Sequence, residues 1–255
     1  MSDSVSAFYN GLAADYHLLF EDWDAAIARQ GEVLDRLMRA AGLPAKARIL
    51  DCACGIGTQA LGLAGCGHVV LGSDASAASI TRARAEAAKR GLDIAFTVAD
   101  MRTLAGIERA AFEAVVCADN ALPHLLSDVE LHAATRAIAA CLKPGGLFLG
   151  SIRDYDSLLS ERPTALAPRF LASGGPHRIA HQVWEWLDEE HYRLHLHIAL
   201  ETDAGWDCRH HVTLYRALGR ATLAAALAAA GLAEIVWLAP EESGYYQPVV
   251  LAKKP

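Results

Sequence analysis

The feature that most constrains the fold is an alternation of short apolar segments and helix-like segments between residues 47 and 152. The apolar segments have the length and the bounding loops of buried strands. In chain order they are "ARILDCA", "HVVLGSD", "IAFTVAD", "FEAVVCA" and "LFLGSI". The segments 59–66, 76–90 and 128–142 between them are predicted to be helices. This alternation predicts a parallel sheet covered by helices on both faces, which is an α/β fold.

The flanking segments extend this arrangement. Asp22 is placed to cap a helix that runs to about Ala41, and Gly42 with Pro44 ends it. The segment "KPGG" is predicted to be a turn before the fifth strand. A helix, "RATLAAALAAAGL", and two strands, "AEIVWLA" and "YQPVVLAKK", close the chain.

A different pattern occupies residues 177–217, where polar and apolar residues alternate in three long segments. The segments are "HRIAHQVWEWL", "HYRLHLHIALE" and "WDCRHHVTLYRAL". Short turns rich in Asp, Glu and Gly separate them, which predicts an antiparallel sheet. The histidines of these segments could bind a transition metal, but no carboxylate or cysteine stands at a ligand spacing beside them. A solvent-facing or oligomeric surface is therefore favoured, and no metal site is predicted. These histidines are His191, His195, His197, His210 and His211.

Composition limits the kind of partner. The chain has 255 residues, is 53% hydrophobic and carries a formal charge of −7, so it has no basic surface for nucleic acid or anionic membrane. Its apolar runs are shorter than a membrane span, and the N-terminus is unlike a secretory signal. The six cysteines lack the spacing of a disulfide framework, which favours a reduced, cytoplasmic setting. A small-molecule partner is expected.

The loop after the first strand, "CGIGTQA", has the G-x-G-x-x-A spacing of a dinucleotide-binding turn. Its glycines are Gly55 and Gly57, and Asp74 ends the next strand, where a carboxylate can accept two hydrogen bonds from a ribose diol. These features fit NAD, and they fit other adenosine ligands equally well.

Three further features favour S-adenosyl-L-methionine. Asp51 precedes the glycines and gives D-x-A-x-G-x-G, with Ala53 at the third position. Asp100 and Met101 follow the third strand and offer an acceptor for an adenine amino group and an apolar surface for its ring. "LKPGG" precedes the fifth strand. In these motifs the chain resembles class I methyltransferases. That resemblance implies a Rossmann-like seven-stranded sheet with one antiparallel strand, here with an inserted antiparallel cap.

Four stretches narrow the resemblance. "ILDCACGIGT", "GSDAS", "DNALPHL" and "RDYD" are similar to signatures of the glycine and sarcosine N-methyltransferases. In that family a glycine stands at the position of Asp119. The resemblance implies that Asn120 and Arg153 face the methyl acceptor. His124 is either a donor in the acceptor site or the hydrogen-bonded start of the next helix. The residues implied to line the cofactor are Asp51, Ala53, Gly55, Gly57, Asp74, Ala75, Asp100, Met101 and Ala118.

The same family uses its N-terminal segment as a lid, so residues 1–44 are expected to close over the cofactor. Tyr16, Trp23 and Arg29 would then surround its methionine part, with Arg29 neutralising the carboxylate. The alternative is a core tryptophan and a solvated helix arginine. Tyrosine side chains could also wall the acceptor site or serve as hydrogen-bonded core residues. These are Tyr215, Tyr245 and Tyr246.

These observations lead to one expected organisation. Residues 45–160 and 218–255 form the cofactor-binding domain, and residues 161–217 form the cap over the acceptor site. The expected function is methyl transfer to a small molecule, an amine bearing a carboxylate. An NAD-dependent dehydrogenase and a non-catalytic S-adenosylmethionine-binding module are the alternatives. The sequence leaves the acceptor open, and a homo-oligomer remains an alternative to a monomer.

Overall fold

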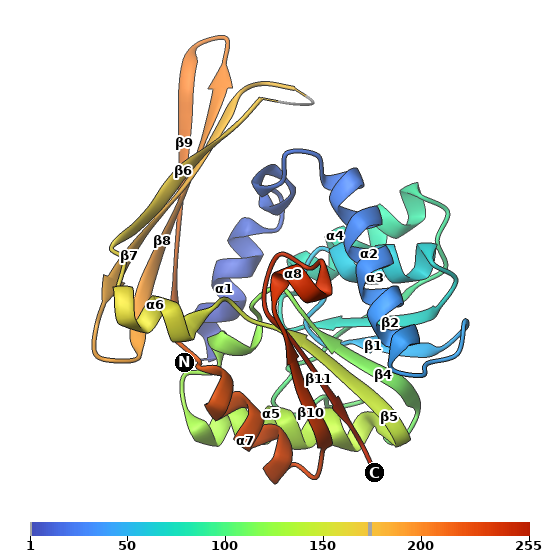
Figure 1. Ribbon diagram of the computed structural model, residues 1–255. Coiled ribbons are helices and arrows are strands. Elements are labelled where there is room, and N and C mark those ends of the chain that lie inside the picture. Colours follow the sequence, from blue (N-terminus) through green and yellow to red (C-terminus); the bar gives the residue numbers. More distant parts are fainter. Residues whose placement is uncertain (1, 173–174) are drawn as a thin grey trace.

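The computed structural model describes residues 2–172 and 175–255, in which a large sheet flanked by helices stands beside a second, smaller sheet (Figure 1). The large sheet has seven strands in the order β10-β11-β5-β4-β1-β2-β3. β11 is antiparallel to both of its neighbours. The other neighbouring strands, β5, β4, β1, β2 and β3 in sheet order, pair in parallel. This confirms the predicted methyltransferase-type sheet. The strands are β1 (Arg48–Asp51), β2 (Val69–Asp74), β3 (Ala95–Val98), β4 (Phe112–Cys117), β5 (Leu142–Ser151), β10 (Ala233–Leu238) and β11 (Val249–Lys253).

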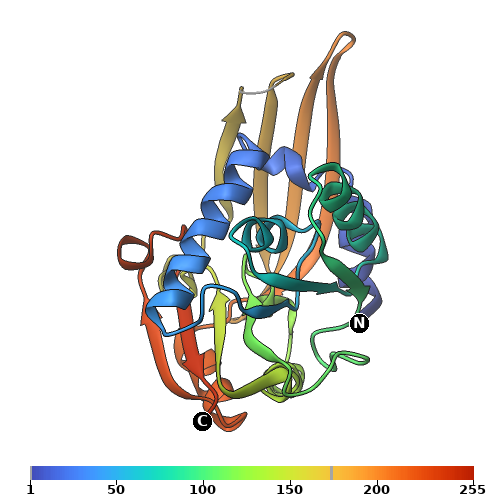
Figure 2. The same cartoon turned by 90° about the vertical axis from the view of Figure 1, so that its right-hand side faces the viewer.

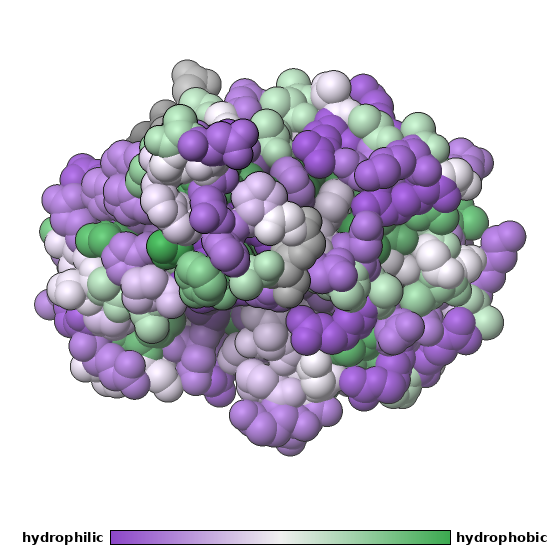
Figure 3. Space-filling model, turned by 90° about the horizontal axis from the view of Figure 1, so that it is seen from above, coloured by the Kyte–Doolittle hydropathy of each residue, from purple (hydrophilic) through white to green (hydrophobic). Residues whose placement is uncertain are grey.

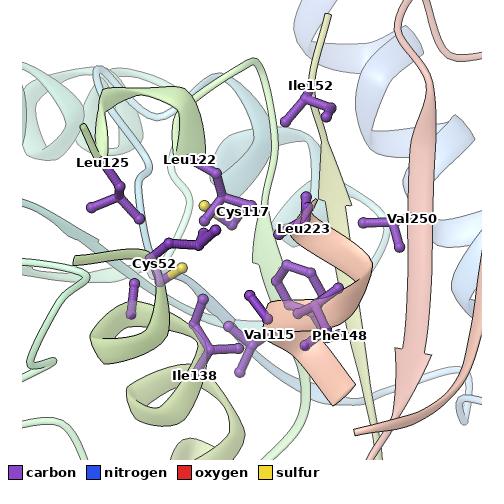
Figure 4. Packing of buried hydrophobic residues seen from close by; sticks show 14 of the residues in the cluster. Cys52, Val115, Cys117, Leu122, Leu125, Ile138, Phe148, Ile152, Leu223 and Val250 are labelled. Carbon is purple, nitrogen blue, oxygen red and sulfur yellow. The ribbon is translucent and has the colours of Figure 1, made fainter. Parts of the chain in front are cut away.

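Helices cover both faces of this sheet because adjacent strand residues point to opposite sides. Ile49 of β1 packs with α2 (Trp23–Ala40), α3 (Thr58–Gly65) and α4 (Ala77–Lys89). Its neighbour Leu50 packs on the other face with α5 (Asp128–Cys141) and α7 (Arg220–Ala229). Figure 4 shows the second cluster, in which Val115 and Phe148 of the sheet lie against Ile138 of α5 and Leu223 of α7. Both faces therefore bury apolar strand residues, as the alternation predicted.

The predicted helix start at Asp22 is confirmed, because its carboxylate accepts a hydrogen bond from Ala25 N at 2.9 Å. The segment "KPGG", predicted to be a turn, is instead a bulge inside β5. Phe112 pairs with Leu142 and Ala114 with Leu147, so the register shifts there. Gly145 supplies the left-handed φ of +75° that this excursion requires.

The smaller sheet, which we call the cap, has the antiparallel order β6-β7-β8-β9. Its strands are β6 (Ala165–Leu171), β7 (Arg178–Trp186), β8 (His191–Thr202) and β9 (Gly205–Arg216). The three long alternations predicted β7, β8 and β9 correctly. They did not predict β6, whose alternation is interrupted by Pro168. A proline is tolerated there because β6 is an edge strand.

Helix α1 (Ser2–Leu12) was not predicted, yet it lies between the cap and the large sheet (Figures 1 and 2). Phe8 and Leu12 pack against Leu196 and Ile198 of β8 and are 7% and 1% exposed. Toward the large sheet, the side-chain oxygen of Asn10 accepts a hydrogen bond from Ser76 Oγ at 2.7 Å. The apolar spacing of α1 could have revealed it.

Shorter elements connect these units: η1 (Tyr16–Leu19), η2 (Leu122–His124), α6 (Tyr155–Glu161) and α8 (Pro240–Ser243). Every helix in the described part of the chain is too short or too polar to cross a bilayer. Hydrophilic and apolar side chains are interspersed on the face seen from above in Figure 3.

Candidate active site

Two adjoining cavities lie at the carboxyl ends of the parallel strands. The first is lined by residues that follow β1, β2, β3 and β4, together with residues of α1. This is where open α/β sheets bind ligands, beside the point at which the strand order reverses between β1 and β4. The second cavity, of about 470 Å³, lies under the cap. Tyr9, Tyr16 and Asp119 line both cavities, so the two spaces meet at these side chains.

The glycine loop after β1 forms one wall of the first cavity. Gly55 and Gly57 have φ of +52° and +99°, in the left-handed region that favours glycine. A Cβ at Gly55 would meet no atom within 4 Å, so the backbone there is open to a ligand. Gly55 and Ala53 line the cavity, whereas Gly57 caps the start of α3, where an added Cβ would meet Ala83 and Leu61 at 3.4 Å.

Asp51 lies beneath this loop and does not line either cavity. Its side chain is 1% exposed, and one carboxylate oxygen has no hydrogen-bond partner. Burial raises the pKa of Asp51 to about 7, against the opposing effect of backbone N–H groups of Ala53 and Ala60. Asp51 therefore supports the loop from below.

Asp74, at the end of β2, presents its carboxylate to the first cavity. It accepts hydrogen bonds from Gly55 N at 2.9 Å and Ser76 N at 2.8 Å. Burial raises the pKa of Asp74, while these two N–H groups act in the opposite direction. The carboxylate is thus held in one orientation beside Ala75, which also lines the cavity.

The third and fourth strands complete this wall with Asp100, Met101 and Ala118. Asp100 is bound by the guanidinium of Arg102, which also donates to Glu130 at 2.7 Å. Although burial alone would raise it, the hydrogen bonds from Arg102 hold the pKa of Asp100 below its ordinary value. Arg102 was not predicted from the sequence, although its position two residues beyond Asp100 was an available signal.

Arg153 follows β5 and lines the second cavity. Its Nη2 donates to Gln182 Oε1 of the cap at 3.1 Å, and its guanidinium carbon lies 5.0 Å from the Trp184 ring centroid. The other terminal nitrogen, Nη1, is buried without a hydrogen-bond partner. No carboxylate of the described residues lies within ion-pair distance of Arg153, since the nearby Asp154 and Asp156 pair with Arg220 instead. Arg153 is a cation with a donor still to be satisfied.

Asn120 lines the same cavity, but its amide is engaged within the protein. Its Oδ1 accepts from Arg153 N at 3.0 Å, and its Nδ2 donates to Tyr155 Oη at 3.0 Å. The residue has a left-handed φ of +65°, which asparagine tolerates well. The side chain therefore fixes the loop after β4 to the residue that follows β5, and so positions Arg153.

Asp119, next to Asn120, also has a left-handed φ, of +59°. Its Oδ2 accepts from Tyr16 Oη at 3.0 Å, and its Oδ1 accepts from Tyr246 Oη. Burial raises the pKa of Asp119, while the Tyr16 hydrogen bond and the charge of Arg153 act in the opposite direction. The resembled motif has a glycine at this position and so gave no signal for a carboxylate here.

His124 lines the first cavity from η2. Its Nε2 lies 2.8 Å from Tyr9 Oη, and its Nδ1 lies 3.3 Å from Leu214 O of β9. Burial lowers its pKa to about 3, so the ring is neutral. His124 ends the turn η2 and does not begin the next helix, and it borders the first cavity and not the second, so its role as a donor in the acceptor site stays a prediction.

Comparison with known proteins agrees with this geometry. Residues 49–146 match the family profile described as "Methyltransferase domain". Residues 49–146 carry a methyltransferase domain of class I. It is similar to a glycine/sarcosine N-methyltransferase of Halorhodospira halochloris, with 27% identity over 54% of this chain and 50% of that protein. A second such enzyme, from Parasynechococcus marenigrum, is 30% identical over 54% of this chain and 48% of its own length. The chain thus spans about half the length of the curated relatives it matches.

A solved structure extends the likeness to nearly the whole fold of this chain. It is that of an S-adenosylmethionine-bound amino pentose methyltransferase from Micromonospora echinaspora. The TM-score is 0.73, with 23% identity and 95% of each chain covered. At this identity the likeness establishes the fold, including the cap.

The cofactor of this domain class is S-adenosyl-L-methionine, and the first cavity fits it. The open backbone at Gly55 lets a ligand approach closely, and the fixed carboxylate of Asp74 can accept from a ribose diol. Met101 and Ala118 give an apolar surface, with Asp100 beside them as an acceptor. All the expected cofactor residues of the strand ends line the cavity except Asp51 and Gly57, which shape its loop.

The three residues predicted to surround the methionine part of the cofactor lie in different places. Tyr16 lines both cavities. Arg29 lines the second cavity and not the first. Trp23 lines neither cavity. Its indole donates to Thr58 Oγ1 at 2.9 Å, which agrees with the alternative prediction of a core tryptophan. Tyr9 was missed because α1 was missed.

Three tyrosines were predicted either to wall the acceptor site or to serve as core residues. Tyr215 and Tyr246 line the second cavity, whereas Tyr245 is buried and donates to Gln30 Oε1 at 3.0 Å. In the cap, the rings of His195 and His210 stack 5.2 Å apart. Within the described residues, no group of three or more His, Cys, Asp or Glu side chains is arranged to hold a metal ion.

Proposed function

We propose that this protein transfers a methyl group from S-adenosyl-L-methionine to the amine of a small molecule that also carries an anionic group. The observation that carries this proposal is Arg153, which lines the second cavity and whose buried Nη1 has no hydrogen-bond partner. A carboxylate can satisfy that donor and the positive charge together. The second cavity meets the first at Asp119, which brings a held acceptor next to the cofactor site.

When bound, the cofactor supplies an electrophilic methyl group, so the protein needs chiefly to orient the acceptor and exclude water. Arg153 and Gln182 would orient the acceptor, with Asn120 holding Arg153 in place. Residues 1–44 would close over both cavities, since Tyr9 and Tyr16 line both, and residues 161–217 would cover the acceptor. This closure would exclude water from the methyl group and the acceptor amine.

The size of the acceptor is a separate point. A cavity of about 470 Å³ lies in the range that holds ligands well above the size of glycine. Its volume favours a larger amino acid, or an amino sugar of the kind named for the Micromonospora echinaspora enzyme, as a second candidate. An amino sugar without an anionic group would leave Arg153 unsatisfied.

Two measurements test the proposal. S-adenosyl-L-methionine and S-adenosyl-L-homocysteine are expected to raise the melting temperature more than NAD does, because a ligand stabilises in proportion to the logarithm of its concentration over its Kd. A methylation screen of amines with and without a carboxylate, together with thiols and phenols, is expected to give turnover with carboxylate-bearing amines. A larger shift with NAD would favour a dehydrogenase, and cofactor binding without turnover on any acceptor would favour a binding module.

A further inference from the structure

We propose that Asp119 binds the ammonium form of the acceptor and accepts a proton from it. The inference rests on the proposed function and adds to it the residue that would make the amine nucleophilic.

The position of Asp119 between the two cavities supports this role. Among the described residues, three line both cavities, and Asp119 is the one acid of the three. It is also the only acidic residue that lines the second cavity within the described part of the chain, where Arg29, Arg153 and Arg169 supply three cations. An acceptor that carries one ammonium and one anionic group therefore finds a single carboxylate in this cavity to which its ammonium can bind. The complementary arrangement places the anion at Arg153 and the ammonium at Asp119.

The surroundings of Asp119 keep its carboxylate available. Tyr16 and Tyr246 each donate to a different carboxylate oxygen, and a carboxylate has about four acceptor positions, so two remain. Tyrosines beside it are neutral near pH 7, because burial raises the pKa of both Tyr16 and Tyr245. The titratable and charged groups facing Asp119 from the packed elements are Tyr16, Asp51, Arg153, Tyr215, Tyr245 and Tyr246.

The backbone gives a second, independent indication. Asp119 and Asn120 are consecutive non-glycine residues with left-handed φ, a conformation that costs free energy and is found disproportionately at functional sites. The turn is held from behind, since Asp119 N donates to Ser151 Oγ at 2.8 Å and Asn120 N to Ser151 O at 3.2 Å. This fixed turn aims the carboxylate at the junction of the cavities.

The proton transfer from the acceptor to Asp119 needs no further reactant. An N–H bond of the acceptor ammonium breaks and an O–H bond forms on Asp119, which leaves a neutral amine with a free electron pair and a neutral carboxyl group. Burial favours this direction, because it disfavours both the ammonium and the carboxylate relative to their neutral forms. The proton returns to solvent when the product leaves.

Asp119→Asn tests the step, because asparagine tolerates left-handed φ and keeps the shape of the side chain but cannot accept a proton. Loss of a general base is expected to lower kcat/KM for the amine found by the screen by about a hundredfold or more. Because the acceptor must then arrive as the neutral amine, the acid limb of the kcat/KM–pH profile that Asp119 sets is expected to be replaced by a rise through the pKa of the substrate amine. Affinity for S-adenosyl-L-homocysteine is expected to stay within about twofold. Tyr246→Phe, which removes one donor and keeps the carboxylate, is the matched control and retains the acid limb.

A binding measurement needs no turnover. Sarcosine and methoxyacetate share a carboxylate and differ in having an ammonium or an ether oxygen at the same position. With saturating S-adenosyl-L-homocysteine, the wild type is expected to bind sarcosine at least tenfold more tightly, and Asp119→Asn is expected to lose that preference. No preference in the wild type, or a preference kept in Asp119→Asn, would overturn the role of Asp119. If Asp119→Asn methylates the amine as fast as the wild type, this inference fails and the proposed function stands; if the wild type methylates nothing, the proposed function itself fails.

Discussion

The hydroxyl of Tyr9 and Nε2 of His124 lie 2.8 Å apart, although 115 positions separate the two residues. Nδ1 of the same ring faces Leu214 O, which can only accept, so Nδ1 carries the proton and Nε2 accepts from Tyr9. One neutral imidazole thus joins α1, the loop after β4 and the cap. The three units meet around the cavities because of contacts of this kind.

Tyr9→Phe removes the hydroxyl that fixes α1 to His124. A neutral hydrogen bond contributes about 1 kcal/mol, so S-adenosyl-L-homocysteine is expected to dissociate roughly fivefold faster. Stopped-flow measurement of the dissociation rate checks this, with hydrogen exchange of the α1 amides reporting the opening. An unchanged rate would show that α1 does not restrain the cofactor.

His124 is expected to make stability depend on pH. Its pKa is about 3 in the folded protein and about 6.5 when unfolded, so between these values the unfolded state binds more protons. Stability is therefore lost as pH falls below about 6.5, by about 2 kcal/mol at pH 5 from this group alone. Asp51 opposes the trend, since its raised pKa makes the folded state bind the extra proton in that window.

The comparison that isolates His124 is His124→Asn, which can still donate to Leu214 O and accept from Tyr9. The drop in unfolding free energy from pH 7 to pH 5, measured with urea, is expected to be smaller in the variant than in the wild type. Equal drops would contradict the buried, neutral state of this ring.

Arg153→Lys keeps the positive charge but loses the fork that binds a carboxylate through two hydrogen bonds. Turnover of a carboxylate-bearing amine is expected to fall tenfold or more, with cofactor affinity nearly intact. A purely structural role predicts lower stability and an equal loss for acceptors with and without a carboxylate. Full activity of the variant, or a native acceptor with no anionic group, would remove the anion from the proposed substrate.

Asp74→Ala removes the carboxylate that faces the first cavity. We expect the binding free energy of S-adenosyl-L-methionine to weaken by roughly 1.5–3 kcal/mol, because a charge-assisted hydrogen bond is lost. Calorimetry measures the change, and Asp93→Ala, on the exposed turn before β3, is the control. Unchanged affinity in a folded Asp74→Ala variant would remove Asp74 from the site.

Gly62→Ala tests the close packing of α3 on α2. A Cβ at Gly62 would lie 2.8 Å from Gly31 Cα and closer still to the carbonyl oxygen of Ile27, so the helices must separate. Overpacking of this kind costs about 1–3 kcal/mol of unfolding free energy. Gly65→Ala, in the same helix with no atom within 4 Å of its Cβ, is expected to be neutral or stabilising. Equal effects of the two variants would contradict the packing argument.

The sequence alone determined the large sheet and the cofactor side of the site. Strand and helix periodicities are local, and parallel strands must bring their carboxyl ends to one edge. Gly55, Asp74, Asp100, Met101 and Ala118 could therefore be placed on one cavity without knowing any contact between them.

Only the tertiary structure decided which side chains meet across the chain. The Tyr16–Asp119 and Arg153–Gln182 contacts join residues separated by 103 and 29 positions, and no local pattern encodes such pairings. The same holds for Trp23, whose helix was predicted correctly but whose indole turned toward Thr58. Local sequence fixes the element on which a side chain stands, whereas the packing of distant elements determines what that side chain contacts.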